Sequence, residues 1–248
     1  MKHNYFTWAA ITIIAMLAAC TYQNEEDWKK EHASTDSVYQ YGTKGLIAFF
    51  AFDNSLNEKT NNGQTVEAEN EVSYSNNTRG ALSKACLYLN GNNSIKVLNQ
   101  KYDTLTVCFW LKSEQQLKYL SEPKPVLVDI GQGATVFEVD GTTGASDINL
   151  IVGDQKTEDK TNTIDTYTEW NLVIIEIVND GVNKLIFYNK INGEDAWRLL
   201  PKNIDYKNGQ VCIGKSSANK GFFKGYIDDL LIYKRALTKD ERENLKKF

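Results

Sequence analysis

Short apolar segments alternate with glycine turns from Gly45 to the end of the chain. The turns carry Asn-Gly or Asp-Gly at 62–63, 90–91, 140–141, 180–181, 192–193 and 208–209. These dipeptides tolerate the positive φ angles of tight hairpin turns, so the segments between them are expected to be antiparallel strands. The predicted strands are residues 46–52, 85–89, 94–98, 105–112, 126–130, 135–139, 148–152, 170–178, 184–189, 196–200, 210–213 and 226–233.

The segment 170–178 is apolar on both of its faces. One face carries Trp170, Leu172 and Ile174, and the other carries Val173, Ile175 and Ile177. A strand that is covered on both sides belongs in the middle of a two-layer structure, so the chain is predicted to be an all-β antiparallel sandwich. The inward positions of the longest strands are expected to be taken by Leu172, Ile174, Leu185 and Phe187 or their immediate neighbours.

One helix is predicted, and it closes the chain. Thr238 and Glu241 have the spacing of a capping box, in which each side chain accepts a hydrogen bond from the other residue's backbone amide. Leu245 and Phe248 lie three residues apart and are spaced to rest on the sandwich.

The N-terminus has the order of a targeting segment. Lys2 precedes an apolar run over 5–19, and the run ends in Leu-Ala-Ala-Cys at 17–20. This arrangement resembles a bacterial lipoprotein signal with its lipobox, in which the thiol of Cys20 is lipidated and becomes the mature N-terminus. The alternative is an ordinary secretory signal or a short anchor helix. The resemblance predicts a signal peptide over 1–19.

A polar segment follows, from Cys20 to residue 44, and is expected to be a flexible stalk because it lacks apolar periodicity. Its acidic run at 25–27 is similar to the surface-export signals of Bacteroidota lipoproteins, and a solvated charge run is the alternative. The predicted location is the outer membrane, exposed at the cell surface and held through the lipid anchor only. The predicted domain is 45–248.

The charge balance restricts the partners. The formal net charge of the chain is −4, and it becomes −5 when the signal is removed with Lys2. Nucleic acid and anionic lipid both require a basic face, so neither is an expected partner. The two histidines, His3 and His32, precede the domain, so no domain histidine is available as a base or a metal ligand.

Three cysteines remain if Cys20 is lipidated. Cys86, Cys108 and Cys212 each lie inside an apolar segment, and an odd number cannot be fully paired. Buried free thiols are the favoured interpretation, and a disulfide between two of them is the alternative.

Several motifs occur in the order of a known family. Residues 225–233 read Gly-Tyr-Ile-Asp-Asp-Leu-Leu-Ile-Tyr, and Arg-Ala-Leu-Thr follows at 235–238. The segment 46–57 contains a Phe-Asp-Asn turn, 87–91 reads Leu-Tyr-Leu-Asn-Gly, and 106–111 reads Thr-Val-Cys-Phe-Trp-Leu. Together with Trp170 they resemble the laminin-G-like, concanavalin A-like domains of bacterial surface proteins, over about 45–248.

This resemblance implies a two-sheet antiparallel jelly-roll sandwich with a short C-terminal helix. The fold carries carbohydrate binding, adhesion and some glycoside hydrolases, so it does not by itself choose a function. The resemblance also implies that Asp228 and Asp53 hold a structural Ca²⁺ with hard oxygen ligands. The alternative is that Asp228 forms hydrogen bonds to nearby groups without a metal.

A hydrolase site is not evident in the sequence. Retaining hydrolases on this scaffold carry Glu-x-Asp-x-x-Glu on one strand. The nearest match begins at Glu138 and continues to Asp140, but no second glutamate follows, and Glu176 stands alone in its segment. We therefore expect a protein without catalytic residues.

A binding module requires an aromatic platform with polar neighbours. The candidate ligand-binding residues are Trp197, Tyr206, Phe222 and Phe223, which lie in or beside turn-rich segments, whereas Trp110 and Trp170 are predicted to be core. The predicted function is a surface-anchored, non-catalytic carbohydrate-binding or adhesion module whose partner is a glycan or a cell-surface protein. The alternatives are a concanavalin A-like glycoside hydrolase and a structural subunit of a cell-envelope complex.

Overall fold

The computed structural model divides the chain into two compact units, Met1–Gln40 and Tyr41–Phe248. Only the second unit contains described residues, so the predicted signal peptide and lipidated Cys20 lie outside them. The described residues are 42–79, 83–97, 100–114, 123–131, 133, 135–140, 147–152, 155–159, 169–178, 184–189, 194–199, 209–216 and 221–247. Among these residues no helix has the length and apolar character needed to cross a membrane.

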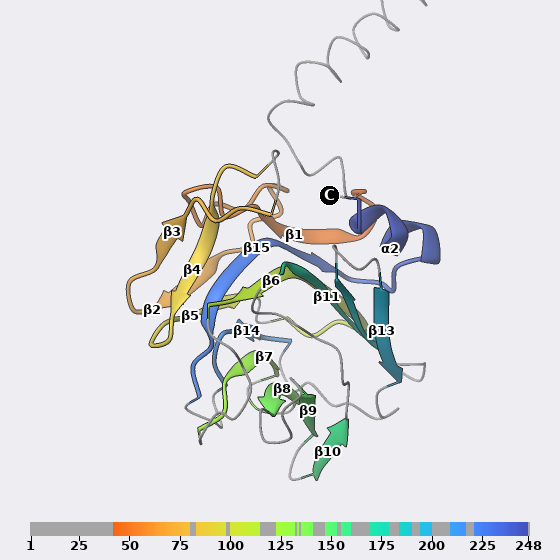
Figure 1. Ribbon diagram of the computed structural model, residues 1–248. Helices are drawn as coiled ribbons and strands as arrows, with labels where there is room; N and C mark the ends of the chain where they lie inside the picture. The colour runs from red at the N-terminus through yellow and green to blue at the C-terminus, as the bar shows by residue number, and fades with distance from the viewer. Residues whose placement is uncertain are drawn as a thin grey trace, which may run out of the picture. The chain divides into compact units, whose positions relative to one another are not determined.

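The first sheet has eight strands and contains the three longest strands of the domain (Figure 1). Its order is β13-β12-β11-β6-β15-β4-β3, and β1 pairs with β15 beside β4. The strands are β1 (Leu46–Phe50), β3 (Ser73–Ser75), β4 (Cys86–Asn90), β6 (Thr104–Ser113), β11 (Asn171–Val178), β12 (Lys184–Asn189), β13 (Glu194–Leu199) and β15 (Lys224–Tyr233).

The second sheet has seven strands in the order β10-β9-β8-β7-β14-β5-β2. They are β2 (Val66–Glu69), β5 (Ser94–Val97), β7 (Val126–Ile130), β8 (Thr135–Asp140), β9 (Asp147–Val152), β10 (Gln155–Asp159) and β14 (Val211–Ile213). All strand pairs within the two sheets are antiparallel. The predicted two-sheet antiparallel sandwich is therefore confirmed.

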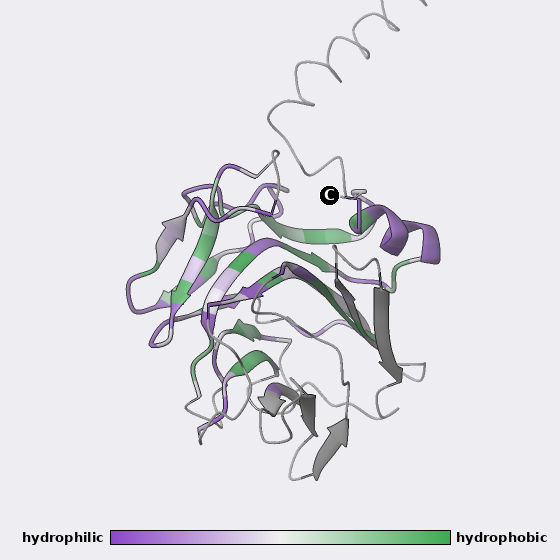
Figure 2. Ribbon diagram, in the orientation of Figure 1, coloured by the Kyte–Doolittle hydropathy of each residue, from purple (hydrophilic) through white to green (hydrophobic). Residues whose placement is uncertain are grey.

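The hydrophobic core lies between the two sheets. Alternate residues of the strands of both sheets enter it, and Figure 2 shows the corresponding alternation of hydrophobic and hydrophilic residues along β4 and β15. The inward residues of β6 are Leu105, Val107, Phe109 and Leu111, and those of β11 are Val173, Ile175 and Ile177. Since successive side chains of a strand point to opposite faces, the residues between them lie on the other side of the first sheet, which we call the outer face.

This assignment falls within the prediction for β11, which allowed Leu172 and Ile174 or their immediate neighbours as the inward residues. Leu172 and Ile174 are fully buried, but they lie on the outer face, and their neighbours face the second sheet. Sequence alone did not distinguish the two sides because both faces of this strand are apolar. The side chains of Leu185 and Phe187 lie outside the described residues.

The predicted C-terminal helix is present as α2 (Lys239–Leu245), with both hydrogen bonds of its capping box. Arg235 donates to both carboxylate oxygens of Glu241, and this contact lowers the pKa of Glu241 to about 2. Leu245 is the buried residue of the helix, whose remaining surface is mostly hydrophilic (Figure 2).

The cysteines of the domain are free thiols, as predicted. Cys86 and Cys108 are buried and Cys212 is partly buried. Burial is the main cause that raises the pKa of Cys212 to about 11. These residues therefore behave as small apolar side chains.

Candidate functional site

The outer face of the first sheet is organised in rows that cross neighbouring strands. In the first row, Tyr88 of β4 pairs with Tyr226 of β15, and Tyr226 pairs with Lys112 of β6. Residues that are directly opposite in a sheet project from the same face. On the other side of β6, Leu111 pairs with Asn171 of β11. Because these two strands are antiparallel, Trp170, which precedes Asn171, lies opposite Lys112 and so belongs to the same row.

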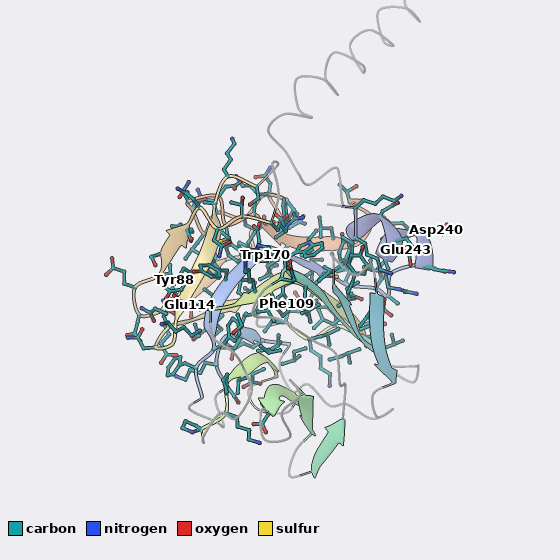
Figure 3. The ribbon with its side chains drawn as sticks, in the orientation of Figure 1. Tyr88, Phe109, Glu114, Trp170, Asp240 and Glu243 are labelled. Carbon is teal, nitrogen blue, oxygen red and sulfur yellow. The ribbon has the colours of Figure 1, made fainter. Side chains whose placement is uncertain are left out.

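The far end of the outer face is covered by α2 and the segment that precedes it. The backbone amide of Leu237 donates to Glu176 of β11 over 3.1 Å, and Arg242 of α2 lies 3.3 Å from the same carboxylate. The Lys246 ammonium lies 5.0 Å from the centre of the Tyr188 ring on β12. Figure 3 shows Asp240 and Glu243 of this helix on the opposite side of the view from Tyr88 and Glu114.

The middle of the outer face is covered by Arg79. Its guanidinium lies 5.0 Å from the centre of the Trp110 ring, and Trp110 is fully buried. Among the described elements, α2 and Arg79 thus cover the far end and the middle of the outer face. The first row, with Tyr88, Tyr226 and Lys112, stays partly exposed.

Three aromatic rings form this part of the surface, which we call the aromatic platform: Tyr88, Tyr226 and Trp170. The Tyr88 and Tyr226 ring centres lie 5.3 Å apart with an interplanar angle of 33°. The Tyr226 and Trp170 centres lie 6.5 Å apart at 52°. Both tyrosines are partly exposed, whereas Trp170 is 7% exposed. The tyrosines therefore supply the accessible ring surface of the platform, and the buried Trp170 packs at its edge.

The rim of the platform is fixed by an ion pair. The Tyr88 hydroxyl donates to the Glu114 carboxylate over 2.5 Å, and the Lys224 ammonium lies 3.1 Å from the same oxygen. Burial, followed by the contact with Glu114, raises the pKa of Tyr88 to about 12. The Tyr88 hydroxyl lowers the pKa of Glu114, with a further contribution from Lys224. At neutral pH, Tyr88 therefore remains a neutral donor. Glu114 is ionised, and its charge is balanced by the Lys224 ammonium.

Two other polar groups of the platform are not engaged by the described residues. The indole N–H of Trp170 is buried and has no hydrogen-bond partner. Lys112 is partly exposed and forms no ion pair with a carboxylate of the described chain. The Trp170 N–H is therefore a buried donor that no described group satisfies, which costs free energy.

The platform depends on a close approach of two backbones at Gly225, the residue before Tyr226. A Cβ atom at this position would lie 2.3 Å from the backbone oxygen of Lys112 and 2.7 Å from the Phe223 ring. Glycine therefore allows β15 and β6 to pair closely beside the platform.

Asp228 and Asp229 lie in a buried cluster next to the platform, because Asp228 pairs with Trp110, two residues from Lys112 on β6. The strand register shifts between Asp228 and Leu231, and Asp229 has a positive φ of 45°. This irregularity lets both carboxylates contact Arg79, with 3.5 Å from Asp228 to the Arg79 Nε and a closer contact from Asp229 to its Nη2. Ser83 donates to Asp228 over 2.7 Å.

The expected calcium ligands are therefore engaged by protein groups. Asp53 accepts hydrogen bonds from the backbone amides of Lys84 and Ala85 at 2.9 and 3.1 Å, and Asp228 is held by Arg79 and Ser83. In the described part of the chain, no three acidic, histidine or cysteine side chains are arranged to hold a metal ion. These contacts match the hydrogen-bonding alternative, and calcium binding stays a prediction.

Burial dominates the electrostatics of Asp228. It raises the pKa of this carboxyl from 3.8 to about 7, Arg79 and Ser83 act in the opposite direction, and the nearby Asp53 raises it further. The cluster thus holds more carboxylates than cations, and one proton bound at Asp228 relieves the imbalance.

The predicted ligand-binding aromatics are not gathered at one place by the described residues. Phe223 is fully buried in the inter-sheet core, so its ring has no face for a ligand, and this corrects its assignment. Phe222 is partly exposed, with the Lys215 ammonium 5.1 Å from its ring centre. Trp197 occupies a position on β13 opposite Ile186; its side chain and the whole of Tyr206 lie outside the described residues.

The two strand glutamates that were considered for catalysis are both enclosed. Glu138 is 5% exposed and Glu176 is fully buried. Glu176 accepts from Leu237 and Arg242, as described above, which is the arrangement of a structural carboxylate. Trp110 and Trp170 are buried as predicted, although on the outer face rather than between the sheets.

Sequence reasoning missed Tyr88 and Tyr226. Each was read as part of a family strand motif, and nothing in the linear sequence shows that the two residues are opposite each other. The usable signal was the alternation itself. Tyr88 stands between the core residues Leu87 and Leu89, and Tyr226 precedes the core residue Ile227, so both tyrosines project outward.

Comparisons with solved structures show the same fold. Domain 4 of AbnA, a GH43 extracellular arabinanase from Geobacillus stearothermophilus in complex with arabinotriose, aligns with a TM-score of 0.60 at 20% identity, over 81% of this chain and 98% of that one. The binding domain of botulinum neurotoxin DC in complex with SialylT aligns at 0.58 and 12%, over 82% of this chain and 51% of that one. The same toxin domain in complex with rat synaptotagmin II aligns at 0.57 and 11%, over 82% and 51%.

The chain thus spans about half the length of these toxin domains. No curated protein matches the chain significantly. A family profile does match it, over residues 88–241, which are more than half of the chain and include both tyrosines of the platform and the strands that surround them. The chain belongs to the concanavalin A-like lectin/glucanases superfamily, in its laminin G group.

Proposed function

We propose that this protein is a non-catalytic carbohydrate-binding module and that the aromatic platform is its glycan site. The carrying observation is the row of Tyr88 and Tyr226 beside Trp170, with ring centres 5.3 and 6.5 Å apart. Aromatic faces pack against the C–H surfaces of sugars, and polar groups at the edge bond the hydroxyls. The Glu114–Lys224 pair supplies such groups.

Two features of the protein support this use of the platform. The two tyrosines belong to strands that are paired on both sides, β4 and β15, so little conformational entropy is lost when a ligand binds. Two of the structural neighbours are named as complexes with arabinotriose and SialylT, and this agrees with a sugar ligand on the same fold.

The proposal includes the anchor. Cys20 would carry the lipid, residues 20–44 would form a stalk, and the domain would be displayed at the outer surface of the cell. The support is the order of charged, apolar and small residues before Cys20.

The test is a glycan array probed with the soluble domain, followed by calorimetry on each ligand. Tyr226→Ala should weaken binding at least about tenfold, because it removes the central ring of the platform, and Tyr226→Phe should retain most of the affinity. Phe222→Ala is the matched control, since it truncates a partly exposed ring elsewhere. Equal affinities for wild type and Tyr226→Ala, in variants with unchanged melting temperature, would contradict the proposal.

A further inference from the structure

The platform contains a cation in the middle of its aromatic row. Lys112 is directly opposite Tyr226 on the neighbouring strand, and Trp170 reaches the same row from the other side. Leu111 faces the core, so the Lys112 side chain projects from the outer face. It is partly exposed.

The surrounding charges do not neutralise this lysine. Glu114, the acidic group of the platform, is already paired with Lys224 and accepts from Tyr88. Asp228 and Asp229, in the neighbouring row, form their ion pairs with Arg79. Among the described residues Lys112 is therefore the charged group of the platform that has no ion-pair partner, although the whole chain is acidic, at −4.

The groups without partners on the platform share one chemical property. The Lys112 ammonium and the Trp170 indole N–H are donors only, and the indole nitrogen is buried without an acceptor in the protein. Of the two, Lys112 is partly exposed, so a ligand that pairs with it must present an anionic acceptor beside a ring-shaped apolar surface that can stack on Tyr226 and Tyr88.

We infer that the platform selects an acidic glycan, and that Lys112 pairs with the carboxylate of a uronic-acid-type sugar stacked on Tyr226. This inference rests on the proposed glycan site and specifies its ligand class. Charge-assisted contacts of this kind are stronger than neutral hydrogen bonds, so the carboxylate contributes selectivity as well as affinity.

The experiment compares polysaccharides that differ only in the acid group. The probes are polygalacturonate, alginate and hyaluronan, each paired with its carboxyl-reduced form, at low and at high sodium chloride. We expect wild type to bind at least one acidic form about tenfold more tightly than its reduced form, and added salt to diminish the preference.

The variants assign the preference to one residue. Lys112→Met retains much of the aliphatic stem and should abolish the preference, whereas Lys112→Arg should keep it. Lys234→Met is the matched control, because it removes the same charge from an exposed position at the other end of β15. Loss of preference in Lys112→Met and not in Lys234→Met supports the inference.

The two proposals fail in different ways. If wild type binds acidic and reduced chains equally, and Tyr226→Ala abolishes both, the glycan site stands and the acidic ligand class is wrong. If Lys112→Met keeps the full preference, the role of Lys112 is wrong. If Tyr226→Ala changes the binding of no glycan that wild type binds, the site itself is wrong and the inference falls with it.

Discussion

The Arg79 guanidinium lies 5.0 Å from the centre of the Trp110 ring and contacts the carboxylates of both Asp228 and Asp229. Arg79 is 5% exposed at its side chain, and Asp228 is not exposed at all. One cation therefore both covers an aromatic ring of the outer face and contacts two acids that the fold has buried.

Removing this cation should destabilise the domain. Arg79→Gln leaves buried carboxylates without their partner, and such a loss costs about 3 kcal/mol. Arg79→Lys should lose less, since it keeps the charge but not the planar contact with Trp110. Urea unfolding measures both values. A free energy of unfolding unchanged by Arg79→Gln would show that the cluster is held by other contacts.

Asp228 should make stability depend on pH in an unusual direction. Its pKa is raised from 3.8 to about 7, so the folded state binds the proton more tightly than the unfolded chain. This contribution is fully present below about pH 4 and is lost as the pH rises to 7, on the order of 3 to 4 kcal/mol in total. Asp228→Asn cannot ionise and should flatten this part of the profile.

The measurement is the free energy of unfolding between pH 4 and 8 for wild type and Asp228→Asn. The difference between the two proteins isolates this group from other titrating residues. Asp103→Asn, at an exposed position, is the control and should leave the profile unchanged. A wild type that gains stability relative to Asp228→Asn between pH 4 and 7 would reverse the sign and refute the prediction.

The enclosed glutamates should not support hydrolysis. Glu176→Gln and Glu138→Gln are expected to leave the affinity for any bound glycan largely intact, because neither carboxylate is open to solvent. Glu176→Gln should instead lower stability by about 1 to 3 kcal/mol, since it weakens the contacts to Leu237 and Arg242. Reducing-sugar release is the check: turnover by wild type that either variant abolishes would favour a hydrolase.

Calcium provides a separate test of the Asp53 and Asp228 pair. If these residues hold Ca²⁺, adding it to chelator-treated protein should raise the melting temperature, and Asp228→Ala should remove the effect. The hydrogen-bonding alternative, in which Arg79 and Ser83 hold Asp228, gives no shift. A calcium-dependent increase that disappears in Asp228→Ala would establish the metal site and require Arg79 to move.

The anchor can be tested directly in cells. Cys20→Ser should abolish incorporation of labelled fatty acid and leave the precursor uncleaved by the lipoprotein peptidase, because the thiol is the acylated atom. Fatty acid labelling that persists in this variant would exclude the lipobox interpretation.

The fold was largely predictable because most strands are apolar. All twelve predicted strands are present, with boundaries shifted by no more than two residues. The three missed strands, β2, β3 and β10, are each the outermost strand of a sheet. The edge strands β2 and β3 have no fully buried residue, so the hydrophobic pattern that identifies a strand is weak there.

The site was less predictable because it depends on register. Tyr88 and Tyr226 lie far apart in the sequence, and only the pairing of β4 with β15 makes them neighbours. Phe223 shows the opposite error: its place beside a turn suggested exposure, but the chain turns it into the core. Local composition identifies candidate aromatics, whereas their common surface is set by long-range pairing.

The two ends of β15 serve different parts of the domain. The Tyr233 hydroxyl lies 3.4 Å from the backbone oxygen of Gly42, near the start of the domain, while Tyr226 lies seven residues away, roughly 20 Å along the strand. A tension applied between the N-terminal side and a ligand on Tyr226 therefore runs along this strand. Its hydrogen bonds to β6, β4 and β1 lie across that direction and are loaded together in shear, so the bound domain should resist mechanical force better than a sheet that opens from one end.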